Sequence, residues 1–249
     1  MPNLGLGNNL QSESTVSAGA RSSVVSDSYA INLDGSGDFL DLNADLSSYF
    51  PNSADWAMSA WIKVDIGNTD ANRILFSTGD ASSDIRWGVS GSNGYIQLNY
   101  DGVSKTDNLA DIDSGNWHNI IVHYDHSETD IIFYTDGVKT KEYPVSYGSA
   151  SISGADAIIG AASSDTSSLQ LNAKIGTLSI FNKPLTAQNI SDLSGNSGFD
   201  ASSISGCQGW WRMGDGTENG SGTTIYDMSG NSNNGTLNGD PTIDEDTVE

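Results

Sequence analysis

The chain has almost no cysteine. Cys207 is the single one in 249 residues, so no disulfide can form within the chain and no zinc site can be built from cysteines. We expect its thiol, close to a pair of tryptophans, to pack as a small buried apolar group. A domain of this length buries enough apolar surface to fold without such cross-links.

Basic residues are scarce too. Ten Lys and Arg stand against 32 Asp and Glu, which gives a formal net charge of −22. Such a surface repels a phosphate backbone, so we do not expect nucleic acid as a partner. It favours solubility, cation binding or a saline setting, where salt screens the repulsion between the acids.

Groups for catalysis are also few. Retaining glycosidases need two carboxylates about 5.5 Å apart, and the chain's six glutamates supply no such pair on one strand. His118 and His123 point to opposite faces of a predicted strand, so they cannot share a metal. We expect His118 to pack at the edge of the core, and no Ser–His–Asp arrangement is indicated. The sequence therefore predicts a protein that is not an enzyme and has no catalytic residues.

Long apolar runs are missing as well. No stretch of 18 apolar residues exists that could span a membrane as a helix. Residues 1–28 lack the basic start and apolar centre of a secretory signal peptide. We interpret residues 1–28 as an extended N-terminal arm, 29–239 as one folded domain and 240–249 as an acidic C-terminal tail.

What the chain does have is a series of short alternating stretches. From Trp56 to Val64 every second residue is apolar, which is typical of a half-buried antiparallel strand. Asp136-Gly137 between two such stretches predicts a hairpin, and a change of parity at Gly176 indicates a β-bulge. Only Pro184 to Leu193 has a helical pattern, with Thr186 as its N-cap. The sequence predicts an all-β sandwich of two antiparallel sheets with one short helix.

The C-terminal segments are the most specific. A strand around Trp210-Trp211 precedes an Asp/Ser/Gly/Asn turn and a last short strand ending at Leu237, which we expect to lie beside the first strands. In this order the chain resembles the laminin-G-like and pentraxin-like jelly rolls of the concanavalin A-like lectin/glucanase superfamily. The segments that carry the resemblance are Ile31 to Gly35, Met58 to Lys63, Gly115 to Ile120, Tyr134 to Val138, Leu171 to Phe181, Leu185 to Ile190 and Gly235 to Leu237.

The resemblance implies two antiparallel sheets, one of them concave, with rim loops that contact glycans or proteins and in some members hold a structural calcium. Residues 1–28 lie outside it, and an arm of Gly, Asn and Ser without an export signal also resembles structural proteins of marine bacteriophages. This second resemblance implies a virion surface protein, a capsid decoration or fibre part, anchored by its arm to other virion proteins and able to form a homo-oligomer. The alternatives are a free carbohydrate-binding domain outside cells and, less favoured, a glycan-cleaving enzyme.

Calcium is the cofactor that the sequence favours, because oxygen ligands from Asp and Asn suit this ion. Asp227, Asn231 and Asn233 share the C-terminal turn, and Asp34 lies in the N-terminal turn expected beside it. These four residues are the candidate ligands. The same side chains are also typical of turns in which they bond the backbone, and that alternative stays open.

Glycan binding would use aromatic rings on an exposed face, because sugar rings stack on them. Trp87, Tyr95, Tyr100 and Tyr147 are the candidates, since they lie in the turn-rich middle strands. The alternative for each ring is packing in the core. The other tryptophans are predicted to pack in the core or at sheet edges.

Overall fold

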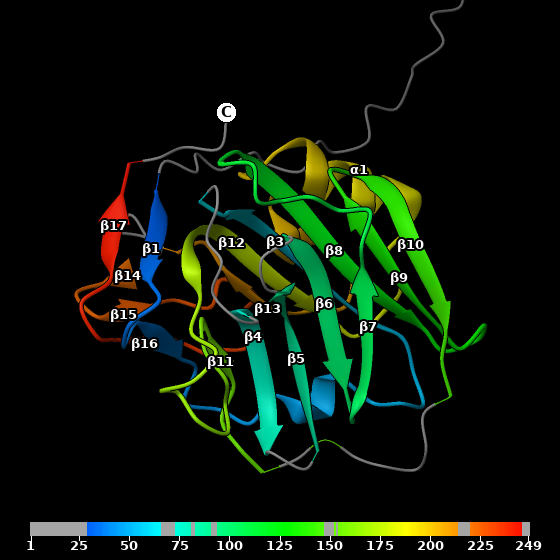
Figure 1. Ribbon diagram of the computed structural model, residues 1–249, viewed down its shortest axis with the longest axis horizontal. Helices are drawn as coiled ribbons and strands as arrows, with labels where there is room; N and C mark the ends of the chain where they lie inside the picture. The colour runs from blue at the N-terminus through cyan, green and yellow to red at the C-terminus, as the bar shows by residue number, and fades with distance from the viewer. Residues whose placement is uncertain are drawn as a thin grey trace, which may run out of the picture.

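Two antiparallel β-sheets lie face to face in the computed structural model (Figure 1). The structure describes residues 29–65, 73–80, 83–90, 94–146, 152, 154–213 and 220–245. Antiparallel pairing joins all the neighbouring strands of both sheets in these ranges. The predicted all-β sandwich with one short helix is confirmed.

The first sheet has eight strands in the described part of the chain, in the order β10-β9-β8-β3-β12-β1-β17, with β13 paired to the second half of β12. Its strands are β1 (Ala30–Asp34), β3 (Trp56–Lys63), β8 (Trp117–Asp125), β9 (Asp130–Thr135), β10 (Val138–Pro144), β12 (Asn172–Phe181), β13 (Cys207–Trp211) and β17 (Thr242–Asp244).

The second sheet has nine strands within the described residues, in the order β14-β15-β16-β2-β11-β4-β5-β6-β7. Its strands are β2 (Phe39–Asp41), β4 (Arg73–Asp80), β5 (Ser83–Ser90), β6 (Tyr95–Tyr100), β7 (Val103–Asp107), β11 (Ile158–Ile159), β14 (Gly220–Ser221), β15 (Thr224–Ile225) and β16 (Gly235–Asn238).

The main core fills the space between the sheets. Trp56 of β3 stacks on Tyr100 of β6 with ring centroids 5.5 Å apart, which joins the two layers by aromatic contact. Ile, Leu, Val and Phe side chains from both sheets complete this cluster. Buried rings of this size dominate core energetics, so the two sheets are held as one unit.

A second, smaller core lies on the outer face of the eight-stranded sheet. Helix α1 (Ala187–Gly195) and the short 3-10 helix η3 (Ala201–Ser203) pack there, while the 3-10 helix η1 (Ser47–Tyr49) follows β2. The prediction of Thr186 as N-cap is confirmed, because its side chain accepts a hydrogen bond from the backbone N–H of Asn189. The half-buried character expected of β3 is wrong, since this second core buries the outer face as well.

Other local predictions can be compared with the pairing. Asp136-Gly137 connects β9 to β10 as a hairpin, and the register of β12 against β3 shifts at Gly176, as expected of a bulge. Leu237 of β16 pairs with Leu40 of β2, so the last strands do close against the first. The predicted acidic tail is partly structured, because β17 pairs with β1.

The N-terminal arm, residues 1–28, lies outside the described residues. Among the residues that are described, no helix is long and apolar enough to cross a membrane.

Candidate functional site

The outer face of the nine-stranded sheet carries polar side chains on β5 and β6. On β6, Ile96 and Leu98 point into the core, so Gln97 and Asn99 point the opposite way. On β5, Trp87 points inward and Arg86 outward by the same alternation. These outward side chains, with Ser104 of β7 opposite Asn99, form one surface over three neighbouring strands.

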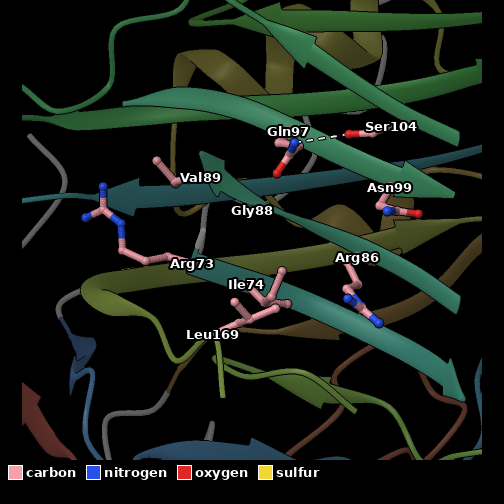
Figure 2. Close-up of a pocket in the computed structure, with 9 residues that line it drawn as sticks. All are labelled: Arg73, Ile74, Arg86, Gly88, Val89, Gln97, Asn99, Ser104 and Leu169. Carbon is pink, nitrogen blue, oxygen red and sulfur yellow. Dashed lines mark hydrogen bonds between the residues drawn. The ribbon is translucent and has the colours of Figure 1, made fainter. Parts of the chain in front are cut away.

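This surface is hollowed into a pocket of about 210 Å³ (Figure 2). The pocket is smaller than the ~300–1,000 Å³ typical of sites for drug-sized ligands, so it suits a single small polar unit. It is lined by Arg73, Ile74, Arg86, Gly88, Val89, Gln97, Asn99, Ser104 and Leu169.

The floor of the pocket is backbone. A Cβ atom on Gly88 would lie 2.0 Å from the carbonyl oxygen of Arg73, so glycine is the residue that lets β4 and β5 approach here. The side chain of Arg73 has no exposed surface, and Figure 2 shows its guanidinium pointing away from Arg86, Gln97 and Asn99. Arg73 therefore shapes the floor with its main chain.

One wall comes from the loop between β11 and β12. Leu169 has a φ of +55°, a left-handed conformation that is unusual for a branched side chain. Its carbonyl oxygen accepts a hydrogen bond of 2.9 Å from the N–H of Ile74, which ties the loop to the start of β4. Leu169 and Ile74 give the pocket an apolar side, and strained residues of this kind are frequent at ligand sites.

The opposite side of the pocket offers hydrogen-bonding groups. Gln97 donates from Nε2 to Ser104 Oγ at 3.0 Å, which orients its amide (Figure 2). Asn99 Oδ1 is buried and accepts no hydrogen bond from the protein. A buried acceptor without a protein partner costs about 1–3 kcal/mol.

Arg86 brings a positive charge to this side, and Asp84 balances it. The Arg86 guanidinium is bonded to the Asp84 carboxylate, and the two side chains are 24% and 7% exposed. Burial raises the pKa of Asp84 above its usual value, although the neighbouring guanidinium acts to lower it. The charge-paired Arg86 keeps part of its donor surface open to solvent.

The structure corrects two of the predicted sugar-stacking residues. Trp87 is 0% and Tyr100 1% exposed, because both belong to the inward parity of their strands. Neither ring can stack on a sugar from outside. Tyr95 shares the outer face of β6 with Gln97 and is half-buried, about 7 Å further along the strand at ~3.3 Å per residue. Tyr147 lies outside the described residues.

The predicted calcium ligands of the C-terminal turn are engaged with the protein itself. The Asp227 carboxylate accepts hydrogen bonds from the N–H groups of Trp210, Ser229 and Asn233 at 2.9–3.0 Å. The side-chain amides of Asn231 and Asn233 both donate to the Gln208 carbonyl oxygen. These contacts are those of a turn that bonds its own backbone, which was the open alternative.

Asp34 does not join this turn. It pairs with Asn172 at one end of β12, whereas Trp210, bonded to Asp227, pairs with Ser179 near the other end. At ~3.3 Å per residue the two places are on the order of 20 Å apart. In the described part of the chain, no three His, Cys, Asp or Glu residues gather as a metal site. The four predicted ligands therefore do not fit one calcium ion.

One series of hydrogen-bonded side chains was not predicted from the sequence. Ser114 Oγ lies 2.8 Å from His118 Nε2, and His118 Nδ1 lies 2.8 Å from Asp136 Oδ2, the connectivity of a catalytic triad. Acyl transfer also needs donors aimed at an oxyanion beside the serine, but the N–H of Asn116 donates to Ser114 Oγ itself. Asp136 also accepts the Asn119 N–H. We interpret these hydrogen bonds as structural, because they hold the β9–β10 turn against β8. This role differs from the core-edge packing expected of His118.

With the fold and the site described, the family follows from a direct match. A laminin G family model, described as concanavalin A-like lectin/glucanases superfamily, matches residues 34–191. The chain belongs to this superfamily. No curated protein matches the sequence closely enough to count as a relative.

Solved structures share the fold at low identity. A candidate carbohydrate binding protein from Bacteroides ovatus superposes with a TM-score of 0.64 at 17% identity, covering 88% of this chain and 60% of that one. The CBM40 of the Ruminococcus gnavus IT-sialidase gives 0.51 at 12%, over 67% and 98% of the two chains. A heptameric SAP-like pentraxin from Limulus polyphemus gives 0.50 at 15%, over 69% and 84%. At these identities the likeness shows the fold alone.

The pocket residues had a signal in the sequence. In the stretch from Tyr95 to Tyr100, Ile96 and Leu98 define the buried parity, which places Tyr100 inside and Gln97 and Asn99 outside. The prediction of sugar-binding residues relied on aromatic rings and not on which face of the strand each residue occupies. It therefore included Tyr100 and Trp87 and left out the amides of Gln97 and Asn99. No comparable signal indicates Leu169, whose loop folds over β4 from far along the chain.

Proposed function

We propose that the protein is a non-catalytic carbohydrate-binding module. Its sugar lies on the outer face of the nine-stranded sheet, in the pocket formed by Arg86, Gln97 and Asn99. The observation that carries the proposal is the polar pocket itself, in which the Gln97 and Asn99 amides and the Arg86 guanidinium lie beside an apolar wall.

The chemistry of the lining supports a sugar. Each hydroxyl both donates and accepts, and the Gln97 and Asn99 amides and the Arg86 guanidinium offer complementary groups in fixed planes. Ile74 and Leu169 on the other side provide an apolar surface for the C–H groups of a sugar ring. The structural likeness to a candidate carbohydrate binding protein and to a CBM40 points the same way.

Binding without cleavage is part of the proposal. None of the described residues that line the pocket is an Asp or a Glu. Asp84, just outside it, is held by Arg86. Retaining hydrolysis needs two carboxyl groups about 5.5 Å apart, and the lining does not supply them.

A glycan array followed by calorimetry tests the proposal. We expect Asn99→Ala and Gln97→Ala each to weaken binding of the best array ligand about tenfold or more, the effect of losing one or two good hydrogen bonds. Gln188→Ala, an exposed glutamine on α1 at the opposite face, is the matched control and should bind as the wild type does. Unchanged affinity in both pocket variants would place the sugar elsewhere.

Placement on a virion surface and anchoring by residues 1–28 stay predictions, because the arm lies outside the described residues. We favour the free carbohydrate-binding module, since the pocket accounts for it without a further partner. Calcium binding also stays a prediction, which melting curves recorded with and without EDTA would test.

A further inference from the structure

We infer that the pocket takes a neutral saccharide and discriminates against sugars that carry a carboxylate or a sulfate. The inference rests on the proposed function and adds the chemical class of the ligand. It depends on how the one charged side chain that points into the pocket is compensated.

Arg86 is already paired with an anion within the protein. Its guanidinium is bonded to the Asp84 carboxylate, whose side chain is only 7% exposed. Arginine recognises an acidic ligand by offering parallel N–H groups to two of its oxygens. Here one oxygen of Asp84 lies against Nε and Nη2 and so fills one of the two edges of the guanidinium. The donors that remain can bond hydroxyls, but the charge is neutralised.

Apart from Arg73, the other polar lining groups are uncharged. Gln97, Asn99 and Ser104 supply amides and a hydroxyl. Arg73 lies at the floor, and its guanidinium points away from this group in Figure 2. A carboxylated sugar in the pocket would therefore lose hydration without meeting an unpaired positive charge, which is costly.

The surroundings add repulsion. Asp80 and Asp101 are close enough to act electrostatically on Asp84, and the whole chain carries a net charge of −22. Charges further than a Debye length, about 8 Å at physiological salt, are largely screened. The Asp84–Arg86 pair thus decides the preference locally, and the distant acids contribute less.

The test compares lactose with 3′-sialyllactose, and galactose with galacturonate, by calorimetry at pH 7 and physiological salt. We expect the wild type to bind the neutral member of each pair at least about tenfold more tightly. Asp84→Asn removes the counter-charge and keeps the shape, so the acidic member should gain about tenfold relative to the neutral one. Melting temperatures of the variants check that the fold is kept.

Two matched variants isolate the cause. Asp101→Asn changes the net charge equally and lies nearby but does not contact Arg86, so it should leave the preference as in the wild type. Asp84→Asn combined with Arg86→Gln makes the pair neutral again and should abolish the gain for acidic sugars.

The outcomes separate the inference from the proposed function. Wild-type protein that binds the acidic sugars as tightly as the neutral ones would overturn the inference and leave carbohydrate binding intact. So would an Asp84→Asn variant with an unchanged preference. Failure to bind any glycan on the array would contradict the proposed function itself.

Discussion

The two sheets differ in what lies on their outer faces. On the eight-stranded sheet, helix α1 and the segment around η3 cover the outward side chains of β3, β8 and β12. Trp61, an outward residue of β3, donates from its indole N–H to the Leu193 carbonyl oxygen of the helix at 2.9 Å. On the nine-stranded sheet, the outward residues Arg86, Gln97 and Asn99 line a pocket that solvent can enter.

With the proposed function, this difference assigns stability to one outer face and binding to the other. Both sheets contribute their inward faces to the same core, so the pattern of inward residues is alike. The outward residues determine whether other segments cover each sheet. Ala57 and Ile121 on the first sheet are apolar and bind a helix, whereas amides on the second sheet resist such a cover, because burying them without partners costs free energy.

The largest effect that separates the two faces is expected for Trp61→Ala. Removing this ring leaves a cavity between β3 and α1, and substitutions of this kind cost about 3–5 kcal/mol in the free energy of unfolding. Urea unfolding measures the loss. Glycan affinity at the opposite face should not change in the protein that remains folded.

Two milder variants sharpen this comparison. Trp61→Phe keeps most of the ring and loses the bond to Leu193, so we expect a loss of about 1 kcal/mol. Gln97→Ala on the open face should change stability by no more than about 0.5 kcal/mol. A loss for Gln97→Ala as large as that for Trp61→Ala would show that the faces do not divide the two tasks.

Acid should affect one carboxylate associated with each sheet in opposite directions: Asp136 in the β9–β10 turn and Asp84 on β5. Burial acts to raise the pKa of Asp136, but hydrogen bonds from His118 and the Asn119 N–H outweigh it and leave the pKa below the usual value. Burial raises the pKa of Asp84. Asp136 therefore stabilises the fold above the unfolded pKa of about 3.9, and this stabilisation is lost as pH falls through its lower folded pKa.

Asp84 has the reverse sign. Its ionised form is disfavoured in the folded state, and this cost disappears as pH falls from above its raised pKa towards about 3.9. Urea unfolding between pH 6 and pH 2.5 checks both signs. The advantage of the wild type over Asp136→Asn should shrink towards the acid end, while its stability relative to Asp84→Asn should improve. Parallel pH profiles for the two variants would contradict these assignments.

The inward pattern was easier to predict than the outward one. Alternation, the Asp136-Gly137 turn, the Thr186 cap and the bulge at Gly176 are local signals, and each is confirmed in the structure. The cover on β3 depends on contacts between segments more than 100 residues apart, so its buried outer face could not be inferred from one strand. The pocket depends on parity together with the loop that brings Leu169 to β4.

The smallest effect concerns thiol reactivity, which measures access to each face. Cys207 is partly buried and packs against the second core beside η3, and burial raises the pKa of its thiol to about 12. At pH 8 a thiol with an ordinary pKa of ~8.5 holds on the order of 10³-fold more of the reactive thiolate. We expect native protein to resist labelling with a disulfide reagent and urea-unfolded protein to react at once.

Ser104→Cys combined with Cys207→Ser moves the thiol to the exposed rim of the pocket, where it should react quickly and be protected by bound glycan. Equal labelling rates at the two positions in the native state would mean that the second core does not close its face, and the contrast between a covered and an open sheet would then fail.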